Sequence, residues 1–483
     1  MINKADGVFL RPNAGRVLLR PFIPDPMHAS RIIERALAFS EAEVAKELQA
    51  IRMEFNPRHR RLDQAWAQHL ERVASYLPKP QALSAERRAL IGALFTGEYT
   101  LESTALFSPS IVAHPDQDGV AEHELRFILS LRAIGEGHIS SIEFRSGTIC
   151  ADRSILFDQA TPFVSSPQLN ADATSWDRIT GSELKKTGHT GDGENCFPSG
   201  SDGAFTPHEL DGKLPDPARP LEFMPGALQL TVQSGPSSLY EVQFEPSEPL
   251  SERVLFPHSE TETNGMEDVR FVRFVENDQV VTYYGTYTAY NGRAILPQLI
   301  ETTDFCRFRI QTLSGPGIYN KGMALFPRRV EGRYAMLSRQ DNENIFLMFS
   351  DDLHFWSDPE VLIRPEQPWE MVKVGNCGSP LETEAGWLVL THGVGPLRKY
   401  CLGLALLDLQ NPRQVLGRLK QPLLEPQEND WQGYVPNVVY SCGGLIHEGR
   451  LVLPYGTNDS ETRIVTFELD TLLKALLEPA VPV

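Results

Sequence analysis

Two neighbouring carboxylates precede an apolar, strand-like run in the middle of the chain. They are Glu267 and Asp268, in the stretch NGMEDVRF. Because successive side chains of a strand point to opposite faces, we expect at most one of them to reach a shared ligand. Asp459 follows a similar run nearer the C-terminus. An acid beside sugar hydroxyls, together with a second group that positions a nucleophile, is the minimum equipment for glycosyl transfer.

Cationic and polar side chains lie between these carboxylates, where other strand-like runs begin or end. Guanidinium and ammonium groups match the oxygens of phosphate, so the set could form a pocket for a small anion. Arg and Lys are also frequent on exposed strand edges, which is the alternative interpretation of each residue taken singly. The candidates are Arg293, Arg309, Lys321, His392 and Tyr400.

The runs that carry these residues recur along the chain. Each is rich in Tyr, Leu, Val and Phe and ends in small polar or basic residues, and the last four begin 53, 53 and 63 residues apart. A recurring unit made only of strands predicts a β-propeller, in which equivalent positions of successive blades converge on one end of a central channel. The five runs cover residues 126–132, 281–288, 334–339, 387–393 and 450–456.

A helical region precedes the strands. Apolar residues recur every three to four positions between about 29 and 94, and Ser40 with Glu43 fits a capping box that begins a second helix. We therefore predict a helical region over residues 1–99 and an all-β domain over 100–483. Gly, Ser, Asp and Pro dominate residues 161–220, which predicts a long polar insertion. Residues 469–477 carry the apolar face of a closing helix.

The composition excludes several classes of function. With 63 acidic and 45 basic residues the net charge is −18, which argues against binding nucleic acid or membrane surfaces. The N-terminus lacks the apolar core of a signal peptide and no long apolar span is present, so we expect a cytoplasmic protein. The six cysteines show no metal-site spacing, and dinucleotide and phosphate-loop motifs are missing. No metal or organic cofactor is expected.

Several longer stretches are distinctive when taken together and in order. They are NGMEDVRFV, VTYYGTYTAYNGRAIL, NKGMALFPRRVEGRYAMLSR, GNCGSPLETEAGWLVLTHGV and GYVPNVVYSCGGLIHEGRLVLPYGTND. Together they resemble glycoside hydrolase family 130, over roughly residues 103–475. The resemblance implies a five-bladed β-propeller that cleaves β-mannosidic bonds with inversion. In most members this is phosphorolysis that yields α-mannose 1-phosphate, and in some it is hydrolysis.

The resemblance also implies a role for each candidate residue. Asp268 matches the family's general acid, which protonates the leaving oxygen through a sugar hydroxyl. Inversion then requires phosphate or water to approach from the opposite face of the sugar. Inorganic phosphate, as co-substrate, would be held by Arg293, Arg309, Lys321, His392 and Tyr400. The substrate-binding candidates are Arg132, Glu267, Asn291, Asn437 and Asp459.

Departures from the family pattern leave the linkage and the acceptor sugar open. Val269 stands where the family usually has proline, and Asn376 and Cys377 stand in the run GNCGSP. The first hypothesis is an inverting β-mannoside phosphorylase that acts on a β-mannoside oligosaccharide and phosphate, since a hydrolase needs no phosphate pocket. One alternative is an inverting β-1,2-mannosidase, and another is a non-catalytic sugar-binding propeller. The helical region is a candidate interface for a homo-oligomer. Bases available to a mannosidase are Glu136, Glu382 and Glu384.

Overall fold

The computed structural model describes residues 9–77, 83–169, 238–428 and 433–478, and the backbone of two short paired strands, β9 (Ile179–Thr180) and β10 (Ala204–Phe205). Most of the described secondary structure is β-strand, as predicted. From residue 170 to 220 the predicted polar insertion lies outside the described residues, apart from β9 and β10.

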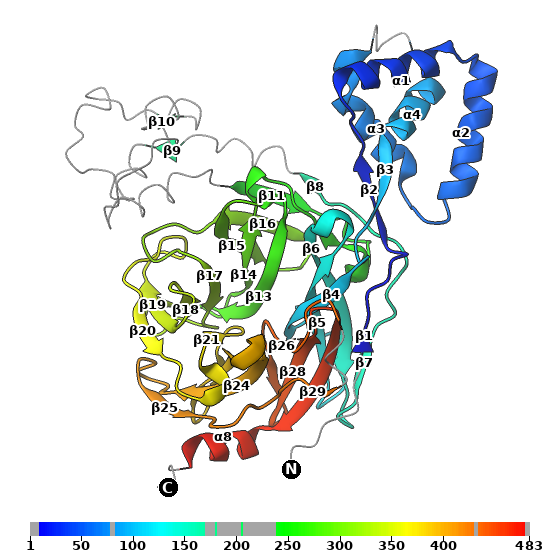
Figure 1. Cartoon of the computed structure of the whole chain (residues 1–483). Coiled ribbons are helices and arrows are strands. Elements are labelled where there is room, and N and C mark those ends of the chain that lie inside the picture. Colours follow the sequence, from blue (N-terminus) through cyan, green and yellow to red (C-terminus); the bar gives the residue numbers. More distant parts are fainter. Residues whose placement is uncertain are drawn as a thin grey trace, which may run out of the picture.

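Four helices form a compact unit that stands apart from the strands (Figure 1). Two paired strands, β2 (Val17–Pro21) and β3 (Thr96–Thr100), join this unit to the rest of the chain. The helices predicted from apolar spacing are therefore confirmed. The first described strand, β1 (Phe9–Leu10), instead pairs with the last strand of the chain, so these residues belong to the β-region. The helices are α1 (Pro26–Ala38), α2 (Glu41–Phe55), α3 (Leu62–Arg72) and α4 (Ala85–Leu94).

The predicted capping box at the start of α2 is present. Ser40 Oγ accepts a hydrogen bond from the Glu43 amide, and the Glu43 carboxylate accepts one from the Ser40 amide at 2.7 Å. Both bonds satisfy amide groups that a helix start leaves without partners.

Replacing Ser40 with alanine is expected to destabilise the helical unit by about 1 kcal/mol, because one amide of the first turn loses its acceptor. Urea unfolding followed by circular dichroism measures this change. Ser30→Ala is the control, since the Ser30 hydroxyl donates only to a carbonyl within α1. Equal unfolding midpoints for the two variants would contradict the assignment.

The strands form five consecutive antiparallel groups. In the first three, neighbours in sequence pair with one another; in the fourth, β21 and β22 both pair with β23, and in the fifth, β26 and β27 both pair with β28. The first is β4 (Ala105–Ala113), β5 (Leu125–Ile134), β6 (Ser140–Ile149) and β7 (Ile155–Phe157). The second is β13 (Gly265–Val275), β14 (Val281–Tyr290), β15 (Ile295–Thr302) and β16 (Arg307–Thr312). The third is β17 (Lys321–Leu325), β18 (Tyr334–Arg339), β19 (Ile345–Ser350) and β20 (Glu360–Ile363). The fourth is β21 (Lys373–Asn376), β22 (Leu381–Thr383), β23 (Gly386–Val394), β24 (Tyr400–Leu407) and β25 (Val415–Arg418). The fifth is β26 (Val439–Tyr440), β27 (Leu445–His447), β28 (Arg450–Thr457) and β29 (Glu461–Glu468).

Short additions extend this plan. β12 (Val254–Leu255) pairs with β6, while β11 (Leu239–Gln243) joins β16 and β8 (Gln168–Leu169). A single parallel bridge from Ser140 to Gly265 links the first and second groups into one sheet. The predicted closing helix is confirmed as α8 (Leu469–Leu477), which packs against β24, β25 and β29.

Each strand group packs its apolar side chains against the next group. The first strand of a group contacts the neighbouring group in every case, and β4 contacts both β13 and β28. Separate apolar cores fill these five contacts, for example the one in which Leu337 and Trp387 join the third group to the fourth. Consecutive groups therefore lie next to one another, and the contact of β4 with β28 brings the fifth group beside the first (Figure 1).

Within the described residues, no helix is long and apolar enough to cross a membrane. Five of the six cysteines are described and all five are free thiols, four of them buried. No group of side chains suited to holding a metal ion occurs in the same part of the chain.

Candidate active site

Asp268 lies on an irregularity at the start of β13. The register between β13 and β14 shifts between Glu267 and Arg270, and the backbone of Asp268 has a φ of 52°. A β-bulge changes the normal alternation of side chains and re-aims them. As a result both carboxylates bind one side chain: Arg132 reaches Glu267 at 2.7 Å and Asp268 at 3.2 Å. The bulge thus lets both carboxylates share a protein partner, while the expectation that at most one of them reaches a bound ligand stays a prediction.

The Asp268 carboxylate is held by further groups. Ser108 donates a hydrogen bond to it at 2.8 Å from a second bulge, in β4, where Ser108 itself has a φ of 49°. Burial raises the pKa of Asp268, but the nearby cations, led by Arg132, outweigh burial and lower the pKa to about 2. Asp268 is thus ionised at neutral pH.

Asp459 lies close enough to Asp268 for the charge of Asp268 to affect the pKa of Asp459. It follows β28, and both it and Asn458 have positive φ values, of 49° and 55°. Burial, with a smaller contribution from the negative charge of Asp268, raises the pKa of Asp459 to about 6. Strained backbone at Ser108, Asp268 and Asp459 therefore gathers at one place, which is typical of functional sites.

Replacing Asp459 with asparagine is expected to increase stability at pH 7.5 by about 2 kcal/mol, because the pKa of Asp459 is raised and its ionisation costs folding free energy. Because the folded state favours the protonated form of Asp459, the contribution of this carboxyl to stability is fully present below about pH 4. It is lost as the pH rises through about 6 and the carboxyl ionises. The gain in the variant should thus disappear at pH 4. Urea unfolding at both pH values tests this, and a variant no more stable than the parent at pH 7.5 would contradict it.

A group of cations adjoins the carboxylates. Lys321, at the start of β17, lies 3.6 Å from Glu267 and pairs in register with Arg339 at the end of β18. The Arg339 guanidinium is buried and donates through Nη1 to His392 Nε2 at 3.0 Å. Its Nε has no hydrogen-bond partner among the described residues. Lys321 and Arg339 thus bring positive charge from the third strand group toward Glu267.

His392 is neutral in this setting. It is fully buried, and burial together with the charges of Arg339, Lys373 and Arg270 lowers its pKa well below the usual value. Since Arg339 donates to Nε2, the ring proton must sit on Nδ1, which faces the sulfur of Cys377 at 3.8 Å. His392 therefore orients Arg339 and adds no charge.

Two tyrosines complete the wall around His392. Tyr400 stacks on its ring at a centroid distance of 6.0 Å, and Lys373 Nζ lies 5.6 Å from the Tyr400 ring centroid. Tyr440 meets His392 edge-on at 5.1 Å and accepts a hydrogen bond from Arg270 at 2.7 Å. Because Arg270 also bonds the backbone oxygen of Asp268, the cation group and the carboxylates form one continuous site.

The structure brings most of the predicted residues together. Asn437, with a φ of 62°, lies before β26, and its carbonyl oxygen accepts a hydrogen bond from the Tyr400 amide. The residues of the predicted set that gather here are Arg132, Glu267, Asp268, Lys321, His392, Tyr400, Asn437 and Asp459.

Three predicted residues form no contact with this group among the described residues. Arg309 is exposed on β16, opposite Glu301 and Glu241 in register, and three strands away from β13. Asn291 accepts hydrogen bonds from the amides of Arg293 and Ala294, so its side chain closes its own turn. Arg293 is exposed in that turn, and among the described residues it forms no hydrogen bond or ion pair with the site.

The sequence assigned no role to Ser108, Arg270, Arg339 and Lys373. Two of them had a usable signal, because Arg339 ends a predicted strand run and Lys373 begins β21.

The structure also places two of the carboxylates that were candidate bases for a hydrolase. Glu382 accepts two hydrogen bonds from Arg328, at 2.7 and 2.8 Å. Glu384 is exposed in the turn before β23.

Carboxylates with opposed pKa shifts beside buried cations are typical of sites that act on glycosidic bonds. Comparison with known proteins agrees. Residues 240–478 match a family profile described as beta-1,4-mannooligosaccharide phosphorylase. The chain belongs to glycoside hydrolase family 130 and is an enzyme of that family.

Two sequence relatives support this assignment. A 1,2-beta-oligomannan phosphorylase of Thermoanaerobacter sp. is 34% identical over 229 residues, which is 46% of this chain and 74% of the relative. A beta-1,2-mannobiose phosphorylase of Listeria innocua is 32% identical over 231 residues, 46% of this chain and 63% of the relative. The solved structure of the Listeria innocua enzyme with beta-1,2-mannobiose is similar at 21% identity and a TM-score of 0.46, covering 78% of this chain and 93% of that one.

Proposed function

We propose that the protein is an inverting β-mannoside phosphorylase that releases α-mannose 1-phosphate from β-mannosides. The observation that carries this proposal is the buried Arg339, whose Nε lacks a partner and whose Nη1 is held by a neutral His392. A buried donor without a partner is costly unless a ligand supplies the acceptor. A phosphate oxygen between Arg339, Lys321 and Lys373 would do so, whereas water as nucleophile requires no such group of cations.

The chemistry follows from the positions of the charges. A phosphate oxygen bonds to the anomeric carbon while the bond from that carbon to the leaving oxygen breaks, and Asp268 supplies the leaving oxygen with a proton, directly or through a sugar hydroxyl. The cations around Asp268 keep it ionised. A phosphate dianion beside Lys321 offsets part of the positive charge that lowers the pKa of Asp268, and a bound sugar excludes water. Substrate and phosphate together would therefore load the acid with its proton.

We also propose that the five strand groups are the blades of a five-bladed β-propeller. Each group contacts the next, and the fifth contacts the first through β28 and β4. A cavity of about 390 Å³ supports this arrangement, because every one of the five groups contributes residues to its wall. They include Val112, Val272, Pro327, Pro380 and Ile446.

The reverse reaction tests the function. Given α-mannose 1-phosphate and mannose or a mannobiose as acceptor, the enzyme should release inorganic phosphate and lengthen the acceptor by one mannosyl unit. The products of trials with β-1,2- and β-1,4-linked acceptors then identify the linkage, which the relatives and the family profile describe differently. Absence of phosphate release with any acceptor would contradict the proposal.

A further inference from the structure

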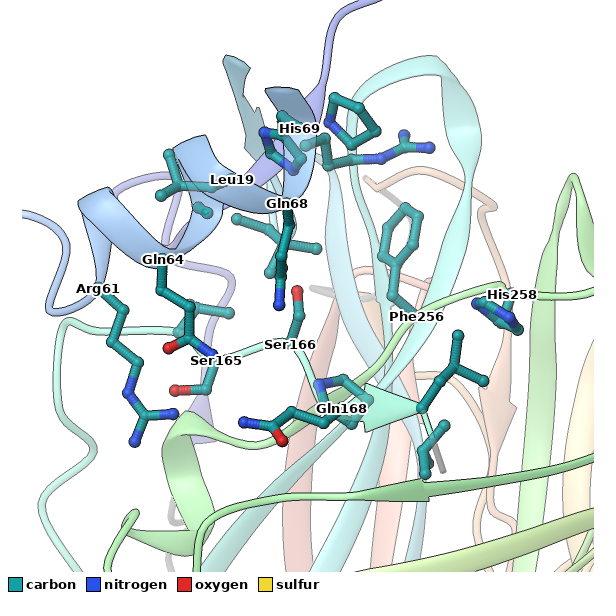
Figure 2. Close-up of a pocket in the computed structure, with 18 of the residues that line it drawn as sticks. Leu19, Arg61, Gln64, Gln68, His69, Ser165, Ser166, Gln168, Phe256 and His258 are labelled. Atoms are coloured by element: carbon teal, nitrogen blue, oxygen red, sulfur yellow. The ribbon is translucent and has the colours of Figure 1, made fainter. Parts of the chain in front are cut away.

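A second cleft lies between the helical unit and the β-region. Its volume is about 480 Å³, within the usual range for small-molecule sites. One wall is α3 and the other is the segment 164–169, while β2, β11 and residues 255–258 close the sides (Figure 2). None of the residues gathered around Asp268 contributes to its wall.

Ion pairs fix the two walls relative to each other. Arg60, before α3, pairs with Glu252 at 3.0 Å and lies over the ring of Phe163 at 4.3 Å. Arg61 pairs with Glu248 at 3.1 Å. Because Glu252 and Glu248 are buried and belong to the β-region, these ion pairs hold the helical unit against the β-region and so fix the position of the walls of the cleft.

Two arginines lie at one end of the cleft. Arg20 stacks on Phe256 at 4.5 Å but has no ion pair among the described residues, and Arg72 has none either. The carboxylate whose charge reaches Arg20 is Glu136, in the β5–β6 turn. Glu248 is the single carboxylate of the described lining, and Arg61 already binds it. In a chain of net charge −18, this arrangement indicates an anionic ligand group.

The middle of the cleft offers both donors and acceptors. Gln64 and Gln68, one helical turn apart on α3, face Ser165 and Ser166 across it (Figure 2), and their amides have no partner among the described residues. His69 Nδ1 lies 2.7 Å from Thr96 Oγ1, whose own hydrogen goes to the Gly92 carbonyl. Nδ1 must therefore be the donor, and Nε2 of the neutral ring is left as an acceptor.

This combination of groups matches one class of ligand. Unpartnered amides, a hydroxyl and a ring acceptor suit a polyol, Phe256 offers an apolar face, and two guanidinium groups suit a phosphate ester. We propose that the cleft is a second ligand site, for a sugar that carries a phosphate. The choice of mannose 1-phosphate as the probe rests on the proposed function, while the site itself does not. A ligand here would touch both the helical unit and the β-region.

Calorimetric titration of the full chain with α-mannose 1-phosphate tests the proposal. The parent should bind two equivalents, one at each site. Arg72→Ala should lose one of them or weaken it at least tenfold, as expected for removing a charged donor. Lys321→Ala should affect only the other. If the proposed function is wrong but the cleft binds sugar phosphates, the parent binds one equivalent that Arg72→Ala removes and Lys321→Ala leaves intact.

Control variants distinguish a specific loss of binding from a loss of folding and from a general effect of removing a positive charge. Arg35→Ala removes an exposed arginine of α1 outside the cleft and should bind as the parent does. Gln68→Leu keeps the charge of the cleft and should also weaken binding, and thermal midpoints show that each variant is folded. Inorganic phosphate or mannose alone should bind the cleft at least tenfold more weakly. The proposal is overturned if Arg72→Ala and Gln68→Leu bind as the parent does, or if inorganic phosphate binds as tightly as the sugar phosphate.

Discussion

Replacing Asp268 with asparagine should lower kcat for phosphorolysis by about 10²–10⁴-fold, the usual contribution of a positioned general acid. Asparagine fills the same space and can still accept a hydrogen bond from Ser108, which lies 2.8 Å from the carboxylate. It cannot, however, deliver a proton to the leaving oxygen. Initial rates with a β-mannobiose and saturating phosphate measure the effect.

Two further measurements make this prediction specific to the acid. Asp278→Asn changes an aspartate in the exposed turn at the other end of the β13–β14 hairpin and should leave kcat unchanged. A substrate with a good leaving group that needs no protonation should recover much of the rate in Asp268→Asn. A variant that turns over mannobiose at the parental rate would remove Asp268 from the acid role.

Replacing Arg339 with alanine should reduce kcat/KM for phosphate by about 10–10²-fold, which corresponds to losing charged hydrogen bonds worth roughly 1.5–3 kcal/mol. The mannoside KM should change little, because the carboxylates that we assign to the sugar are held by Arg132. Kinetics at varied phosphate and fixed mannoside measure the split between the two constants.

The loss of Arg339 has a second consequence at His392. Arg339 is one of the charges that lower the pKa of His392, so the variant should show activity that depends more strongly on pH below neutrality. Arg309→Ala is the matched control, since Arg309 is an exposed arginine of an outer strand. Equal phosphate dependence in the two variants would take Arg339 out of the phosphate site.

Sequence patterns were sufficient for the element types. The recurring strand runs coincide with β5, β14, β18, β23 and β28, because alternating apolar residues report directly on burial. The capping box is equally local, and Ser40 and Glu43 lie where the pattern puts them. Both predictions depend on neighbours in sequence.

The composition of the site could not be obtained in the same way. Spacing locates a residue within a strand run but does not say which strand of a group faces the axis, so exposed Arg309 and inner Arg339 looked alike. Nor does alternation anticipate a bulge, which is why Glu267 and Asp268 were expected on opposite faces. Local sequence rules do not predict irregular backbone at functional sites, because the strain there is maintained by contacts with the surrounding fold and not by neighbours in sequence.

Phosphate dependence tests the central claim most directly. A β-mannobiose is incubated with the enzyme, with and without inorganic phosphate, and products are followed by proton and phosphorus NMR. We predict one α-mannose 1-phosphate for each bond cleaved when phosphate is present, and no turnover when it is omitted. Free mannose released at the same rate without phosphate would contradict the account and identify the enzyme as a hydrolase.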